Sequence, residues 1–201
     1  MKNFCYIVDR DFGFAPNPFN GYCTLADCKP RTRYSAQVGD RIFGLAGKKY
    51  RKNGSHRLIY AMKVTEILTF DEYFKDPRFQ LKKPIVHSNY KRQYGDNIYY
   101  KDGTSEYHQL DSHHSFQDGV MHSGNRDHDT KIDKVLISND YIYYGDKKPL
   151  IPQHLLNNID SDKNIIVKRH HKNRFHKDFM ESIDKYWESL PRGIYGNPNE
   201  W

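Results

Sequence analysis

The densest group of side chains capable of chemistry lies between His108 and Asp133, where histidines and aspartates are concentrated. Its members are His108, Asp111, His113, His114, Asp118, His122, Asp127, His128, Asp129 and Asp133. Imidazole nitrogens and carboxylate oxygens bind zinc, manganese or iron, and both groups transfer protons. His113, His114 and Asp118 are the main catalytic candidates, because an irregular loop anchored by Phe116 would present them together. The spacings of known metal motifs are missing, which favours a solvated His-rich loop over a metal cluster.

A second pair of carboxylates follows the first predicted strand. Asp9 and Asp11 are two residues apart, so they emerge on the same side of the chain if the strand continues. Paired carboxylates divide acid and base roles when their surroundings separate their pKa values. Arg10 offers the alternative of a structural ion pair with Asp11, and the structural interpretation is favoured for each acid alone.

The net charge of +7 is unevenly distributed along the chain. Residues 29–63 hold ten Lys or Arg against one acid, so the rest of the chain carries a net charge of −2. A second basic block, residues 163–177, holds six Lys or Arg and no acid. Such segregation favours binding of a polyanion, most commonly DNA or RNA, unless folding scatters the blocks over different faces.

Two basic segments are suited to holding phosphate. Arg31 and Arg33 flank a threonine, and guanidinium groups and hydroxyls both bind phosphate oxygens. The segment between Gly47 and Gly54 adds the cations Lys48, Lys49, Arg51 and Lys52. They would form a mobile clamp on a nucleic-acid backbone without reading its sequence. The glycine-rich phosphate loops of P-loop and dinucleotide-binding proteins are absent, so any nucleotide recognition is of another type.

Three cysteines, Cys5, Cys23 and Cys28, indicate a reducing, cytoplasmic setting rather than a disulfide framework. Cys23 and Cys28 have the spacing of half a zinc site, but no second cysteine pair completes it. No apolar stretch approaches the roughly 20 residues of a membrane span, and the first residues lack the apolar run of a signal peptide. No cofactor is identified by the sequence.

Hydrophobic patterning predicts an α+β fold. Strands are predicted over residues 3–8, 41–46, 57–68, 134–138 and 141–144. Residues 57–68 are the best antiparallel partner for residues 41–46. Residues 12–20 contain two prolines among three phenylalanines, which predicts an ordered loop.

Two helices are predicted, separated by a long irregular region. Thr69 and Glu72 have capping-box spacing, which predicts a short helix ended by Pro77. A single apolar helical stripe near the end of the chain comprises Phe179, Met180, Ile183, Tyr186, Trp187 and Leu190. Residues 85–130 are polar and irregular, which is typical of a functional or mobile loop. With 37% hydrophobic residues, the 201-residue chain is expected to form one domain over residues 1–201.

Several motifs resemble the second subtype of the nucleotide modification associated domain family of bacteria and phages. They are residues 11–19 (DFGFAPNPF), 23–33 (CTLADCKPRTR), 35–40 (SAQVGD), 135–138 (VLIS) and 143–145 (YYG). The resemblance covers about residues 4–155 and implies an association with DNA base modification or phage conflict. It carries no reaction mechanism with it.

A shorter pattern, residues 39–44 followed by 60–64 and Tyr73, resembles the β-barrel core of PUA, ASCH and EVE domains, which bind RNA or modified bases. This resemblance implies a small, strongly bent mixed or antiparallel sheet or barrel. In such a barrel, Phe14, Phe19 and Tyr22 would shape a pocket for a flipped base.

Three functions remain open at this point. The first is binding of nucleic acid or of a nucleotide during DNA base modification or phage conflict. The second is a metal-dependent or acid/base enzyme acting on a nucleotide or modified DNA, using Asp9 and Asp11 or His113, His114 and Asp118. The third is a structural adaptor in a defence complex, which requires a stable protein partner.

Overall fold

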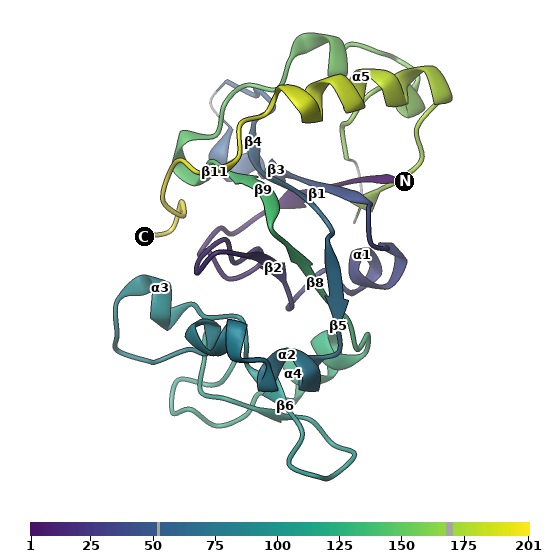
Figure 1. The fold of residues 1–201 in the computed structure, drawn as a ribbon. Coiled ribbons are helices and arrows are strands. Elements are labelled where there is room, and N and C mark those ends of the chain that lie inside the picture. Colours follow the sequence, from purple (N-terminus) through teal and green to yellow (C-terminus); the bar gives the residue numbers. More distant parts are fainter. Residues whose placement is uncertain (52, 168–170) are drawn as a thin grey trace. The chain divides into compact units, whose positions relative to one another are not determined.

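In a computed structural model that describes residues 1–51, 53–167 and 171–201, the chain forms two compact units (Figure 1). The first unit comprises Met1–Asp11, Ala36–Val64 and Asp140–Glu200. The second unit comprises Phe12–Ser35, Thr65–Asn139 and Trp201. Each unit is therefore assembled from segments that are distant in the sequence.

The first unit is built on a six-stranded mixed sheet of order β10-β1-β3-β4-β9-β11. Its strands are β1 (Asn3–Val8), β3 (Arg41–Ala46), β4 (Leu58–Lys63), β9 (Asp140–Tyr143), β10 (His171–Lys172) and β11 (Gly193–Ile194). β1 pairs with β3 in parallel, and β3 pairs with β4 antiparallel, as predicted for residues 41–46. Gly44 of β3 permits this packing, because a Cβ there would lie 2.2 Å from the Tyr60 ring.

The prediction of a closed barrel is wrong. Among the described strands, β10 and β11 form the two edges of an open sheet, so no closed barrel exists and the PUA-like resemblance is not confirmed. The strand predicted over residues 57–68 is also two strands. Val64 hydrogen-bonds with Gly39 and Asp40, whereas the Thr65 N–H donates to the Ile137 carbonyl at 2.9 Å. The backbone thus leaves one sheet at residue 64 and enters another.

Helix α5 (Lys177–Ser189) covers the core of the first unit. Its apolar stripe packs on sheet residues such as Phe43 and Ile142, and Trp187 is 2% exposed. The predicted amphipathic helix is confirmed. Short 3₁₀ helices complete this unit at Lys48–Tyr50, Gly145–Lys147, Gln153–Leu155 and Ser161–Lys163.

The second unit has a three-stranded antiparallel sheet of order β2-β8-β5 and a two-stranded hairpin. The strands are β2 (Cys23–Leu25), β8 (Val135–Ser138), β5 (Glu66–Leu68), β6 (Tyr99–Tyr100) and β7 (His108–Gln109). The helices are α1 (Pro30–Ser35), α2 (Phe70–Lys75), α3 (Tyr90–Gln93), α4 (Ser123–Thr130) and the 3₁₀ helix Pro77–Lys82. Thr69 and Glu72 form the predicted capping box of α2.

Helix α4 lies inside the region predicted to be irregular. It has no apolar stripe, and its eight residues are polar or glycine, so hydrophobic periodicity gives no signal for it. The His122 side chain caps it, with Nδ1 accepting from the Asn125 N–H at 3.2 Å. Asp129 is its buried residue, and this helix therefore brings a carboxylate into the interior of the second unit.

None of the helices in the described parts of the chain combines the length and the hydrophobicity that a bilayer span requires.

Candidate functional site

Three side chains of the second unit, Cys28, His114 and Asp129, meet with the geometry of a reactive cluster. His114 Nδ1 lies 2.8 Å from Asp129 Oδ2, and His114 Nε2 lies 3.8 Å from Cys28 Sγ. One ligand atom from each residue lies within 4.8 Å of the other two. The cluster joins residues that are 86 and 15 positions apart in the sequence.

Local structure fixes each member of this cluster. Cys28 lies between β2 and α1 with φ 57°, in the left-handed region that non-glycine residues rarely occupy. The His114 N–H donates to Ser112 Oγ at 3.3 Å, and the His114 carbonyl accepts from Asn125 Nδ2 at 2.9 Å. Asn125 and Asp129 are four residues apart on α4, so they share one helix face. The helix that holds the His114 loop therefore also carries its carboxylate partner.

Asp129 is fully buried and accepts four hydrogen bonds. Its donors are the Cys28 N–H at 2.8 Å, His114 Nδ1, Tyr99 Oη at 3.0 Å and His128 Nδ1 at 3.2 Å. Burial by itself would raise the pKa of Asp129, but the hydrogen bond and charge of His114 hold that pKa below its ordinary value. Asp129 is thus an anionic anchor that orients the His114 ring, leaving Nε2 toward Cys28.

Asp27, directly before Cys28, is the unexplained carboxyl of this interior. It is 0% exposed, and neither carboxylate oxygen has a hydrogen-bond partner among the described residues. Burial raises the pKa of Asp27 well above its usual range, and the charges of Asp129 and Asp96 raise it further. Ionising a buried acid without a partner costs free energy, so Asp27 is neutral in this interior.

The Cys28 thiol is neutral in this environment. Burial raises its pKa to about 12, and the charges of Asp129 and Asp27 act in the same direction. A thiol, an imidazole and a carboxylate in this order suit either direct proton transfer and nucleophilic chemistry or the binding of a metal ion.

A row of aromatic rings, here called the aromatic row, leads to this cluster within the second unit. Its members in order are Phe19, Trp201, Tyr90, Tyr94, Phe12 and His113. Successive ring centroids are separated by 5.3, 5.5, 6.3, 5.0 and 4.5 Å, and the first four pairs are stacked. Tyr90 is 52% exposed, so core packing alone does not explain why its ring belongs to this row.

The structure brings three of the predicted residues together. The Phe14 ring lies 4.6 Å from the His114 ring and 5.5 Å from the His113 ring. Asp118 is exposed, and its carboxylate accepts from the Val120 N–H at 3.1 Å as a turn contact. The predicted base-pocket residue Phe19 belongs to the aromatic row, whereas Tyr22 packs against Phe79 at 5.2 Å.

Asp9 and Asp11 do not share an environment. Asp9 is exposed, whereas Asp11 is 1% exposed in the first unit. Asp11 Oδ1 accepts from Tyr143 Oη at 2.6 Å, and Oδ2 accepts from Asn199 Nδ2 at 2.7 Å. These contacts hold both carboxylate oxygens of Asp11 by hydrogen bonds within the first unit.

The predicted phosphate-binding residues also differ in exposure. Arg31 and Lys48 are exposed, and Lys49 is exposed but forms an ion pair with Glu200 at 2.6 Å. Arg51 is half-buried, and its Nε donates to the Ala46 carbonyl. Lys52 lies outside the described residues.

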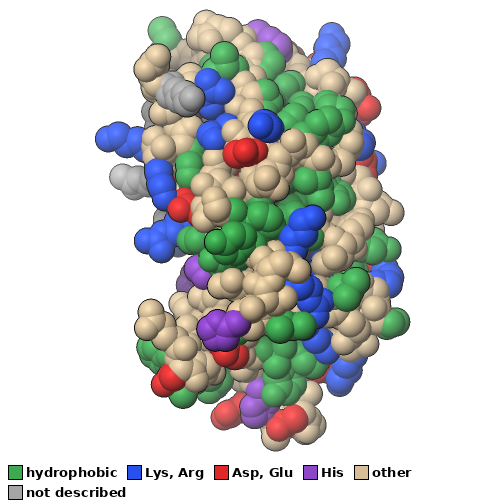
Figure 2. Space-filling model, turned by 90° about the vertical axis from the view of Figure 1, so that its left-hand side faces the viewer, with side chains coloured by type: hydrophobic (Ala, Val, Ile, Leu, Met, Phe, Trp, Pro, Cys, Tyr) green, Lys and Arg blue, Asp and Glu red, His purple; other side chains and the backbone are tan. Residues whose placement is uncertain are grey.

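Arg33, by contrast, is 0% exposed. Its guanidinium donates to the carbonyls of Cys28, Ile132, Lys134 and Asp129. This side chain holds the fold together and is closed to a phosphate in solution. On the face drawn in Figure 2, Lys and Arg side chains are dispersed among hydrophobic, acidic and other groups.

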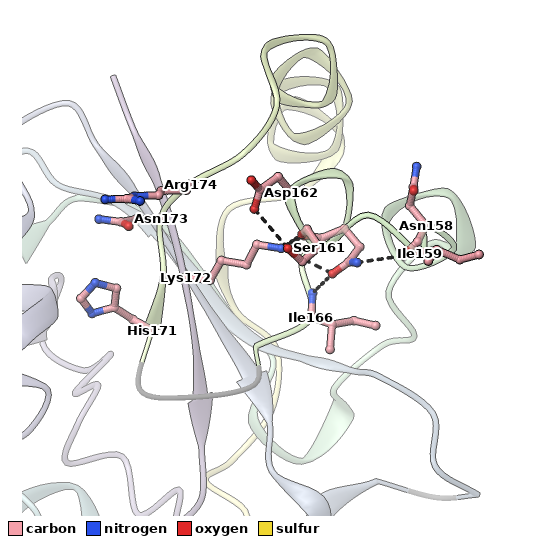
Figure 3. A pocket seen from close by; sticks show the side chains of 10 residues that line it. Asn158, Ile159, Ser161, Asp162, Ile166, His171, Lys172, Asn173 and Arg174 are labelled. Carbon is pink, nitrogen blue, oxygen red and sulfur yellow. Dashed lines mark hydrogen bonds between the residues drawn. The ribbon is translucent and has the colours of Figure 1, made fainter.

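The first unit contains a pocket of about 460 Å³ beside β10 (Figure 3). Its lining includes His171, Lys172 and Arg174. Lys172 Nζ donates to the carbonyls of Asn164 and Ser161, so this cation already ties the pocket walls together. The cluster of the second unit is therefore the candidate functional site.

Sequence patterns did not indicate Asp27, nor the ring partners Phe12, Tyr90, Tyr94 and Trp201. Asp27 and Cys28 lie within residues 23–33, one of the motifs that supported the family resemblance, and this is the signal that could have singled out Asp27. No spacing rule joins Trp201 to residues near position 90, because only tertiary structure makes them neighbours.

A family model described as nucleotide modification associated domain 2 matches residues 1–201, which confirms the family predicted from the motifs. No curated protein and no solved structure matches the chain.

Proposed function

Because the chain belongs to the nucleotide modification associated domain 2 family, we propose that it binds a nucleotide or a base of DNA on the aromatic row and modifies it at the Cys28–His114–Asp129 cluster. The observation that carries this proposal is the row of partly exposed stacked rings that ends at His113, next to His114. Aromatic side chains stack on any base through its π-face. The exposed cation Arg31, which belongs to the same unit as the aromatic row, is the proposed phosphate contact.

The two contacts of the His114 ring support catalysis rather than binding alone. His114 is oriented by a buried carboxylate on one ring nitrogen and faces a thiol with the other. This is the nucleophile, base and orienting-group arrangement of covalent catalysis, and it is also the arrangement of a histidine that ligates a metal. Both forms of chemistry require His114.

Replacing Tyr90 with alanine is expected to weaken binding of a single-stranded oligonucleotide about tenfold, because a base loses one stacking surface. Fluorescence anisotropy of a labelled oligonucleotide measures this affinity. Tyr34→Ala is the matched control, since Tyr34 is a 65% exposed tyrosine of the same unit with no role in the aromatic row. Quenching of Trp201 fluorescence, absent in Trp201→Phe, reports stacking directly. An equal loss of affinity in the Tyr90 and Tyr34 variants would remove the aromatic row from the binding site.

Replacing His114 with glutamine is expected to lower product formation at least tenfold. The wild-type chain is incubated with nucleotides and oligonucleotides, and any nucleotide that co-purifies with the protein is tested first. Nucleosides of changed mass are then measured by mass spectrometry. His87→Asn is the control, because His87 is an exposed histidine of the same unit. Undiminished product in the His114 variant would contradict the proposed reaction centre. Tight oligonucleotide binding without any product would instead identify a reader of nucleic acid.

A further inference from the structure

The proposed function makes no use of the second basic block of the chain, residues 163–177. The end of this block lines a second pocket of the first unit, of about 640 Å³, together with the first residues of β1 and the first turn of α5. The beginnings of β1 and of α5 lie on the same side of this unit (Figure 1). All of the lining residues belong to the first unit, so none of them is part of the aromatic row or of the cluster in the second unit.

Three cations that line this pocket are not neutralised by the protein. Lys2, Arg174 and Lys177 are exposed, and their side chains form no ion pair or hydrogen bond with the described residues. Lys172 of the neighbouring pocket differs from them, because its Nζ already donates to the Asn164 carbonyl at 2.6 Å. The three unpaired cations are therefore available to an anion.

The first turn of α5 adds backbone donors to the same pocket. Its N-cap residue, His176, makes no capping hydrogen bond through its side chain. The Phe179 and Met180 N–H groups donate to the His176 carbonyl at 3.0 and 3.2 Å, whereas those of Lys177 and Asp178 have no acceptor among the described residues. Free N–H groups and the helix dipole both favour an anion at the beginning of a helix.

A buried amide indicates a second feature of the ligand. Asn3 lines the pocket and is 1% exposed. Its Nδ2 lies 3.4 Å from Met180 Sδ, which is a weak acceptor, and its Oδ1 has no hydrogen-bond partner among the described residues. Because buried polar atoms normally have a partner, Oδ1 is suited to accept from a hydroxyl or amino group of the ligand.

Two acids limit the size of the anion. Asp160 and Asp162 also line the pocket, and both are exposed. Asp160 Oδ1 accepts from the Asp162 N–H at 3.0 Å, and Asp162 Oδ1 accepts from Ser161 Oγ at 3.3 Å. The three cations thus exceed the acids by one charge. This balance suits a single phosphate group and disfavours a long polyanion such as a nucleic-acid backbone.

We propose that this pocket of the first unit binds a small phosphate monoester that carries a hydroxyl or amino group, as sugar phosphates and mononucleotides do. Lys2, Arg174, Lys177 and the first N–H groups of α5 bind the phosphate. Asn3 Oδ1 accepts from the hydroxyl or amino group. The site does not depend on the proposed function, because the two share no residue.

Isothermal titration calorimetry of the full chain with ribose 5-phosphate tests this site without involving the aromatic row, because this probe has no base to stack. The expected result is saturable binding of one ligand per chain, weakened about tenfold in Arg174→Gln by the loss of a charge-assisted contact. Arg10→Gln is the matched control, since Arg10 is an exposed arginine of the same unit outside the pocket. No binding at millimolar ribose 5-phosphate, or an equal loss in both variants, would overturn the proposal.

Methyl phosphate tests the role of Asn3, because it is a monoester without a free hydroxyl or amino group. It is expected to bind the wild type more weakly than ribose 5-phosphate does, and Asn3→Leu should remove this difference. The comparison of the two probes on the wild type stays valid if Asn3→Leu folds poorly. Equal affinities of the wild type for the two probes would reject the contact with Asn3.

Adenosine 5′-monophosphate distinguishes the two sources of the phosphate. Tighter binding than ribose 5-phosphate, lost in Arg174→Gln and kept in Tyr90→Ala, assigns a mononucleotide to the pocket, whereas equal binding of the two probes assigns a sugar phosphate. The two proposals also fail separately. Unchanged oligonucleotide binding in Tyr90→Ala would reject the aromatic row alone, and absent ribose 5-phosphate binding would reject this pocket alone.

Discussion

Replacing Arg33 with methionine is expected to lower the free energy of unfolding by about 4 kcal/mol, because a buried set of charge-assisted hydrogen bonds is lost. Arg33 is 0% exposed, and it donates to the Ile132 and Lys134 carbonyls at 2.6 and 2.8 Å. It also donates to Cys28 at 2.9 Å and to Asp129, and its guanidinium lies 5.3 Å from the centre of the Phe70 ring. Methionine replaces the packing of the stem but none of these donors.

Urea unfolding followed by circular dichroism measures this loss. Arg33→Lys is expected to recover only part of it, since an ammonium has three donors and cannot match the planar fork of a guanidinium. Arg31→Met is the matched control, because Arg31 is exposed two residues away, and its stability should change by no more than about 0.5 kcal/mol. Wild-type stability in Arg33→Met would mean that the four carbonyls find other partners. It would then remove Arg33 as the element that holds Cys28 and Asp129 in place.

Lys82 is expected to make the stability of the protein increase with pH in the alkaline range. The side chain is fully buried, and its Nζ donates to Asn17 Oδ1 at 2.7 Å and to the Asn17 carbonyl at 3.0 Å. Burial lowers the pKa of Lys82 from 10.5 to about 8, although the charge of Asp96 acts in the opposite direction. Between these two values the unfolded chain binds more protons than the folded chain, so stability rises with pH.

The size of this effect follows from the difference between the two pKa values. Below pH 8 the full cost of the buried charge is present, and it disappears as the pH rises toward 10.5. The gain is about 3 kcal/mol at about 1.4 kcal/mol per pKa unit. It is measured as the difference between wild type and Lys82→Met in urea unfolding across this range, which cancels the titration of other groups.

Lys82→Met itself is expected to be less stable at neutral pH by about 3 kcal/mol, because Asn17 and the buried Asp96 lose their cation. Lys131→Met, at an exposed lysine of the same unit, should follow the wild-type pH curve. Parallel pH curves for wild type and Lys82→Met would show that Lys82 does not titrate in this window.

Much of the secondary structure was predictable because it depends on local patterns. Strands β1 and β3, the capping box of α2 and the apolar stripe of α5 each have a signal within a few residues. The break between β4 and β5 was not predictable in this way. Residues 57–68 are uniformly β-prone, and only the competing partners Asp40 and Ile137 divide them between two sheets.

Part of the candidate site was predicted, and the division between predicted and missed residues has a physical reason. His113, His114 and Phe14 were identified because their residue types carry chemistry or stacking, and they do lie together. Arg33 was predicted to hold phosphate because its charge is visible in the sequence, whereas its burial under four carbonyls is not. Asp27 gave no signal for the same reason, because neither its burial nor its lack of a hydrogen-bond partner can be read from the sequence.

The sequence by itself determined the family, the α+β class and the local elements, since motifs, capping residues and hydrophobic periods act over short distances. The tertiary structure decided that the sheet stays open, that Asp11 is buried and hydrogen-bonded to Tyr143 and that Cys28, His114 and Asp129 meet. Those outcomes depend on burial and on contacts between residues that can be more than a hundred positions apart, such as the Cys28 N–H and Asp129. Burial is what changes an arginine from a surface cation into a structural donor.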